Sequence, residues 1–114
     1  ARLWRAQYEW FAHAPMAEKA GVKPQTIRDL KAGRVPKSAP KDERAIYDFI
    51  KELYKTRRVS ERSYKRVHAF LGDAAMVELC GILGYYALIS MTLNVFHMLP
   101  PESEKLAFKE PRAK

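Results

Sequence analysis

The chain contains little cysteine and little glycine, and one long part of it contains no charge. Cys80 is the only cysteine among 114 residues, which excludes an internal disulfide framework and every zinc centre built from several thiolates. No stretch alternates apolar and polar residues far enough to predict a sheet. The first residues do not have the pattern of a secretory signal. We therefore expect an all-α protein in the reducing environment of the cytoplasm.

Charge is plentiful elsewhere but unevenly distributed. The sequence has 21 Lys and Arg against 13 Asp and Glu, a net charge of +8, and 47% of its residues are hydrophobic. That hydrophobic share excludes a disordered tail, and the length allows one modest core. Residues 79–99 contain no Asp, Glu, Lys or Arg, so an uncharged run follows a basic first part.

Helix signals cover most of the chain. Apolar spacing and end signals predict helices over residues 1–13, 16–20, 24–32, 41–56, 61–71 and 74–98. Pro15 is expected to end or kink the first helix near residue 14, and Gly72 to end the fifth. Pro24 suits a first helical residue, and Gly33 suits the residue past a helix end. The polar residues 102–114 are expected to form a loose tail.

The uncharged run 79–99 is long enough to cross a bilayer. On a helix the polar side chains of this region fall on two seams, one of Tyr86, Ser90, Asn94 and His97 and the other of Glu78, Tyr85 and Thr92. Two polar seams with glycines between them favour burial among helices, including those of a second subunit. We therefore expect the buried central helix of an oligomer rather than a membrane span. Cys80 within it is expected to be an inert core thiol.

Residues 16–34 look like the helix-turn-helix of bacterial repressors. In that interpretation Gly21 makes the tight turn, and the next helix enters the major groove of DNA. Its side chains Gln25, Thr26 and Arg28 would face the bases, and the net positive charge fits a phosphate backbone. The alternative is a plain helical hairpin, because such turns are common in all-α proteins.

Glu9 and His13 are four residues apart and share one face of the first predicted helix. A carboxylate beside an imidazole orients it, and the pair can act as a general acid and base. A surface or half-buried ion pair is the alternative, because one such pair is not a specific signal. No His, Cys or carboxylate pair has the spacing typical of a zinc site, so we expect no metal.

Three blocks of sequence together resemble the carboxymuconolactone decarboxylase family of the alkylhydroperoxidase D-like superfamily. The blocks are QYEWFAHAP at 7–15 with AGV at 20–22, AIYDF at 45–49 with RRVS at 57–60, and VEL at 77–79 with GYY at 84–86 and MTLNVF at 91–96. They follow the order of the family over about residues 4–101. Because the repressor-like run lies inside this region, we favour the hairpin there and do not expect nucleic acid as a partner.

The resemblance implies a helical bundle over residues 1–101 that assembles into homo-oligomers, commonly trimers or hexamers. It also implies a small-molecule site lined by the helix that carries Glu9 and His13. The peroxidases of the superfamily have a Cys-x-x-Cys-x-x-x-His motif, and aligning its histidine on His13 places the cysteines at Ala6 and Glu9. Since neither residue can attack a peroxide, we do not expect thiol peroxidase activity. Family members have further helices before this region, so we expect the chain to lack them and their partner glutamate.

The resulting hypothesis is a cofactor-independent lyase that transfers a proton to, or releases CO₂ from, a small carboxylated lactone or keto acid. His13 would be the acid and base, and Glu9 would orient it. The candidate substrate-binding residues are two aromatic residues of the pocket wall and two cations for carboxylates, namely Tyr8, Trp10, Arg2 and Arg5. The alternatives are a non-catalytic homo-oligomeric binding protein of the same fold and a helix-turn-helix DNA-binding protein.

Overall fold

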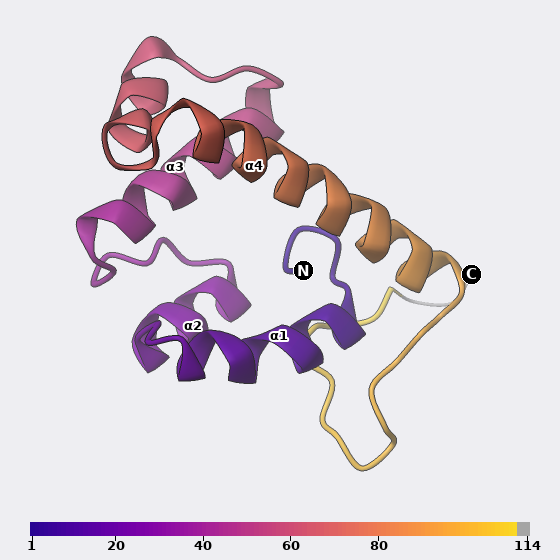
Figure 1. Cartoon of the computed structure of the whole chain (residues 1–114). Helices are drawn as coiled ribbons and strands as arrows, with labels where there is room; N and C mark the ends of the chain where they lie inside the picture. The colour runs from indigo at the N-terminus through magenta and orange to yellow at the C-terminus, as the bar shows by residue number, and fades with distance from the viewer. Residues whose placement is uncertain (112–114) are drawn as a thin grey trace. The chain divides into compact units, whose positions relative to one another are not determined.

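The computed structural model describes residues 1–111, which form four helices and no strand (Figure 1). The helices are α1 (Gln7–Lys19), α2 (Pro24–Ala32), α3 (Lys41–Thr56) and α4 (Glu61–Val95). The prediction of an all-α chain is confirmed for these residues. The chain divides into two compact units, one of residues 1–36 with the residues from Gly84 onward, and one of residues 37–83. Helix α4 therefore begins in the second unit and ends in the first.

Helices α2 and α3 begin and end where the sequence predicts. Pro24 is the first residue of α2, where its missing N–H would have no partner within the helix. Gly33 ends α2 in the left-handed conformation, with φ of 75°. Arg57 ends α3 in a similar conformation, with φ of 63°. These two helices have clear end signals, which explains the agreement.

Helix α1 differs from its prediction at its start. The helix begins at Gln7 rather than at residue 1, because the preceding residues form a turn. The N–H of Arg5 donates to the carbonyl of Arg2 at 3.2 Å, and the N–H of Ala6 donates to the carbonyl of Ala1 at 3.0 Å. Arg5 has a φ of 49°, which a continuous helix would not allow.

Helix α1 also continues through Pro15 to Lys19, so Pro15 does not end the helix and the prediction of a separate helix over 16–20 is wrong. A kink at Pro15, the other predicted outcome, stays a prediction. Pro15 has no N–H to donate to the carbonyl four residues earlier, yet the helix resumes beyond it. The N–H of Ala20 still donates to the carbonyl of Met16 at 2.9 Å. One missing hydrogen bond is therefore tolerated here.

Helix α4 contains the break that the sequence predicts. Gly72 has φ of 75° and ψ of 176°, which are not helical values, so two helical segments meet there. The second segment ends at Val95, before the predicted residue 98, and His97 beyond it has a φ of 53°. The predicted helices over 61–71 and 74–98 are therefore close to the observed segments.

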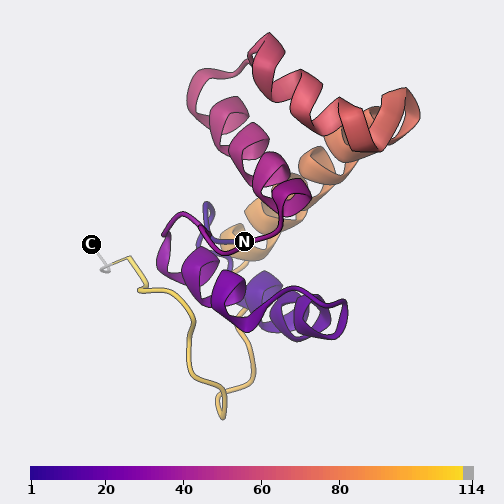
Figure 2. The same cartoon turned by 90° about the vertical axis from the view of Figure 1, so that its left-hand side faces the viewer.

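The core of the second unit lies between α3 and the first part of α4 (Figure 2). Ala45 and Phe49 of α3 pack with Val67 and Met76 of α4, and all four are buried. Ile46, Ile50 and Leu53 of α3 also pack against this core, as apolar residues three and four positions apart on one helix face do. An ion pair of 3.0 Å between Arg66 and Asp48 joins the same two helices.

The first unit contains the hairpin of α1 and α2, which pack against each other. Its C-terminal residues are held to α1, because the buried Gln7 bonds both backbone groups of Phe108. The prediction of a loose tail over 102–114 is therefore wrong at Phe108, although the described part of this segment has no helix or strand. Residues 112–114 of the predicted tail lie outside the described residues.

Helix α4 is mostly exposed within the chain, whereas the sequence predicts a buried central helix. Only 11% of the most apolar stretch of 18 residues in α4 is buried. By length and composition alone, α4 could cross a membrane. Cys80 is exposed too, so the prediction of a core thiol is wrong within a single chain. The large apolar residues exposed along this helix include Val77, Ile82, Tyr85, Leu88, Met91 and Val95.

The ion pairs of the Asp48 carboxylate should make the stability of the fold depend on pH. Burial raises the pKa of Asp48, but the hydrogen bonds and charges of Arg44 and Arg66 outweigh it and hold this pKa below its ordinary value. Such a carboxyl stabilises the fold above its unfolded pKa of about 4 and loses that contribution as the pH falls through the folded value. We expect Asp48→Asn to lower the free energy of unfolding at pH 7 by up to about 1 kcal/mol.

Urea unfolding at neutral and acidic pH measures this contribution. The difference between Asp48→Asn and the wild type is expected to shrink toward zero below about pH 3, where the carboxyl is protonated in both states. Asp42→Asn is the control, because Asp42 is exposed on the same helix and forms no ion pair with the described residues. An equal loss at both pH values would contradict the assignment.

Candidate functional site

The side chains of Glu9 and His13 lie together on one face of α1, as their spacing predicts. His13 Nδ1 is 3.0 Å from the backbone carbonyl oxygen of Glu9 and 3.5 Å from its Oε2. Glu9 is buried, with 7% of its surface exposed. The His13 side chain is 41% exposed, so a small molecule has access to the imidazole but not to the carboxylate behind it.

Tyr86 of α4 completes this cluster from a distant part of the sequence. Its hydroxyl is 3.4 Å from His13 Nε2, and the two rings meet edge to face with their centroids 5.2 Å apart. The sequence placed Tyr86 in a polar seam of the uncharged run but gave it no role in the site. Spacing along one helix is visible in a sequence, whereas a contact across 73 residues is not.

The atoms around His13 determine where its ring proton lies. Both oxygens beside Nδ1 come from Glu9 and act as acceptors, so Nδ1 carries the proton and donates it. In the neutral imidazole Nε2 is then the basic nitrogen, and it faces the hydroxyl of Tyr86. A carboxylate, an imidazole and a phenol in this order can donate and accept a proton at an exposed ring nitrogen.

The polar seam of α4 continues beyond Tyr86 along the same face. Ser90 is one helical turn further and only 1% exposed, and its hydroxyl has no hydrogen-bond partner among residues 1–111. Asn94, a turn beyond that, donates from Nδ2 to the carbonyl of Trp4 at 2.7 Å. The seam thus contacts the residues before α1 as well as α1 itself.

The predicted pocket-wall aromatics do not gather at His13. Tyr8 is exposed, and its ring lies 5.9 Å from that of Phe11. The ring of Trp10 meets that of Phe108 edge to face at 5.5 Å. Among residues 1–111 the aromatic ring that contacts His13 is that of Tyr86.

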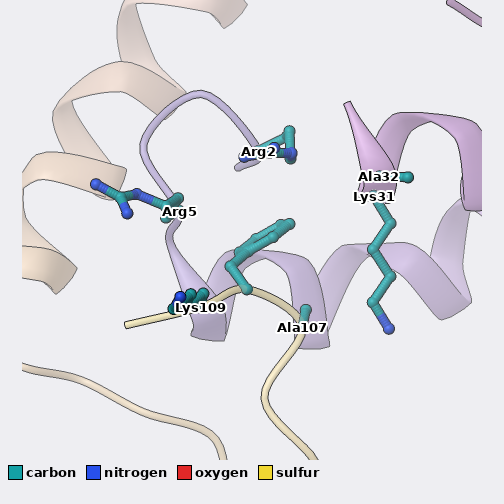
Figure 3. A pocket seen from close by; sticks show the side chains of 7 residues that line it. Arg2, Arg5, Lys31, Ala32, Ala107 and Lys109 are labelled. Atoms are coloured by element: carbon teal, nitrogen blue, oxygen red, sulfur yellow. The ribbon is translucent and has the colours of Figure 1, made fainter. Parts of the chain in front are cut away.

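The predicted cations Arg2 and Arg5 line a cavity of about 400 Å³ in the first unit (Figure 3). Lys31 and Lys109 line the same cavity, and neither was predicted as a substrate-binding residue. Glu9 and His13 are not among its lining residues. The structure therefore brings the acid–base pair together and gathers the two arginines in a separate cavity.

Among residues 1–111 no three His, Cys, Asp or Glu side chains are grouped so as to hold a metal ion.

The structure buries one of the three side chains that the helix-turn-helix interpretation directs at the bases. Thr26 is 3% exposed, so its side chain cannot reach a base. Gln25 donates to Asp29 at 2.9 Å and accepts from Arg28 at 2.9 Å. Gln25 and Arg28 are both exposed on α2, so DNA binding stays an alternative hypothesis.

Comparisons of the chain with protein-family models, with curated proteins and with solved structures found no match.

The tautomer of His13 is a direct test of this geometry. We expect nitrogen NMR above about pH 8 to show the proton on Nδ1 of His13, because its two neighbouring oxygens accept. His68 is an internal control, since its Nε2 lies 2.6 Å from Asp73 Oδ1 and the opposite tautomer is expected there. A proton on Nε2 of neutral His13 would contradict the assigned contacts with Glu9.

Proposed function

We propose that the chain is a carboxymuconolactone decarboxylase-like subunit that catalyses cofactor-independent decarboxylation or a related proton transfer. The observation that carries this proposal is the position of His13, held at Nδ1 by Glu9 and facing Tyr86 at Nε2. The Tyr-Glu-Trp and His positions of the family-like block supply both the carboxylate and the imidazole. The substrate class is a small carboxylated lactone or keto acid.

The reaction needs a proton donor beside the carbon that loses CO₂. When the carbon–carboxylate bond breaks, its electron pair remains on the substrate as a carbanion or enolate. Protonated His13 donates its Nε2 proton to that carbon and afterwards recovers a proton from water. Glu9 holds the ring, because its backbone carbonyl oxygen lies 3.0 Å and its Oε2 3.5 Å from Nδ1. Tyr86 is a further candidate donor, because its hydroxyl is within reach of the same nitrogen.

Substrate binding is proposed for the two arginines and the two aromatic residues. Arg2 and Arg5 would hold carboxylates, since both line a cavity that contains two further cations. Tyr8 is exposed on α1 and is free to contact a ligand. Trp10 supports the cavity through its ring contact with Phe108.

We also propose a homo-oligomer, a trimer or hexamer, in the cytoplasm. The supporting observation is the exposed apolar surface of α4, which includes Leu88 at 56% exposure. Exposed apolar area of this extent is typical of surfaces that another chain covers.

A non-catalytic binding protein of the same fold is the second candidate. It is favoured by the absence of Glu9 and His13 from the lining of the cationic cavity, because a ligand held there need not meet the imidazole. Catalysis distinguishes the two candidates.

Turnover of a panel of carboxylated lactones and β-keto acids, followed as CO₂ release, tests the enzyme. We expect His13→Ala to lower kcat by about 100- to 10,000-fold, because the proton donor is lost. His68→Ala is the matched control, since His68 also pairs with a carboxylate but lies in the second unit. We expect its kcat to be unchanged.

Two results would contradict the proposal. Turnover that is equal in His13→Ala and the wild type would remove His13 from the reaction. No turnover of any panel member by the wild-type chain would favour the non-catalytic candidate.

Light scattering in detergent-free buffer tests the oligomer. We expect three or six times the chain mass of 13.2 kDa. Leu88→Glu should shift the protein toward monomers, because a charge cannot be buried unpaired in an apolar interface. Lys55→Glu, an exposed change on α3, should not. A monomeric wild type would contradict an oligomer, and a chain that stays in solution only with detergent would point to lipid.

A further inference from the structure

The cavity beside the start of α1 has a strongly positive lining. Three separate segments form it, and four of its seven lining residues are cations (Figure 3). Arg2 and Arg5 come from the turn before α1, Lys31 from α2, and Lys109 from the C-terminal segment. No acidic residue lines it.

These four cations have no carboxylate partner within residues 1–111, unlike several other cations of the chain. Arg34, Arg44, Lys65 and Arg66 each form an ion pair of 3.1 Å or less. No ion pair within residues 1–111 involves any of the four lining cations. Within the described residues the charge of these four side chains is therefore not neutralised by a carboxylate, and a bound anion would neutralise it.

The wall of the cavity is fixed by buried contacts. Gln7 donates from Nε2 to the carbonyl of Phe108 at 2.7 Å and accepts the N–H of Phe108 at 3.0 Å. The nearby carboxylate of Glu110 also accepts from Gln7, so it is engaged with an amide rather than with a lining cation. A site whose walls are held before a ligand arrives loses less conformational freedom on binding.

The guanidinium of Arg2 is positioned from two sides. Its central carbon lies 5.6 Å from the centre of the Phe108 ring, within the range of a cation–π contact. On another side it passes Gly33, where an added Cβ would lie 3.0 Å from Arg2 Nη2. Because Gly33 has no side chain, the guanidinium of Arg2 can occupy this space.

We propose that this cavity binds a small organic anion with two or more carboxylate or phosphate groups. Arginine and lysine side chains recognise both groups, and arginine does so through two parallel hydrogen bonds. Cations on three segments suit more than one anionic group. The inference deepens the proposed function, and it rests on that function only in identifying the anion with the substrate.

Calorimetric titration of the full chain at low ionic strength tests the site with four probes: citrate, pyrophosphate, inorganic phosphate and acetate. We expect citrate or pyrophosphate to bind once per chain and about tenfold or more tightly than acetate. The tighter of the two shows whether the site prefers carboxylates or phosphates. Neither probe binding below about 10 mM would overturn the proposal.

Charge-removing variants locate the binding. Arg2→Gln and Lys31→Gln should each raise the Kd by about tenfold or more. Lys31 is exposed, so its substitution leaves the fold intact even if Arg2→Gln does not. Lys55→Gln removes one exposed charge from α3 and should change the Kd by less than about twofold. If Lys55→Gln and Lys31→Gln weakened binding equally, general attraction by the net charge would explain the binding, and the proposed site would be overturned.

His13→Ala separates this inference from the proposed function. We expect it to leave the Kd for the tighter probe within about twofold, because His13 does not line the cavity. Anion binding without turnover would support the anion site and contradict the proposed catalytic activity. Turnover with the same KM in Lys31→Gln and the wild type would support the proposed catalytic activity. It would also show that the cavity is not where the substrate binds.

Discussion

The paired hydrogen bonds between the Gln7 amide and the Phe108 backbone hold the first unit together. Both residues are buried, so breaking the pair would leave unsatisfied polar groups at a cost of about 1–3 kcal/mol each. Gln7 is the first residue of α1, and Glu9 and His13 follow within two turns. The bonds therefore fix the start of the helix that carries the acid–base pair and also one wall of the cationic cavity.

The positive charge of the chain has two different structural explanations. In the second unit, Asp48 accepts from Arg44 and Arg66, and Lys65 pairs with Glu61 on α4. Those cations belong to solvated helix faces whose charge is locally balanced. The cations around the cavity are not balanced by any ion pair among the described residues. A net charge of +8 is therefore a poor guide to nucleic acid here, because part of it is paired and part of it lines a small cavity.

The sequence predicted what depends on neighbouring residues. The ends of α2 were predictable because Pro24 and Gly33 act locally, and the Glu9–His13 pair because one helix turn places it. The turn before α1 was missed, because no local signal opposes the helical pattern there. The contacts of Tyr86 with His13 and of Phe108 with Gln7 join residues far apart, and no spacing rule predicts them. The pair of Glu9 and His13 on one helix was therefore predictable, whereas the distant residues that contact this helix were not.

The two polar seams of α4 have different partners, and this sharpens what must cover the helix. Tyr86 and Asn94 bond to α1 and to the turn before it, and Ser90 between them is buried. Tyr86 and Asn94 therefore have partners within the first unit, whereas the Ser90 hydroxyl has none among residues 1–111. Thr92 of the other seam donates to the carbonyl of Leu88 in its own helix at 2.9 Å, so its hydroxyl needs no outside partner. A covering surface can therefore be apolar at Thr92, provided that it also accommodates the exposed Tyr85 and the carboxylate of Glu78.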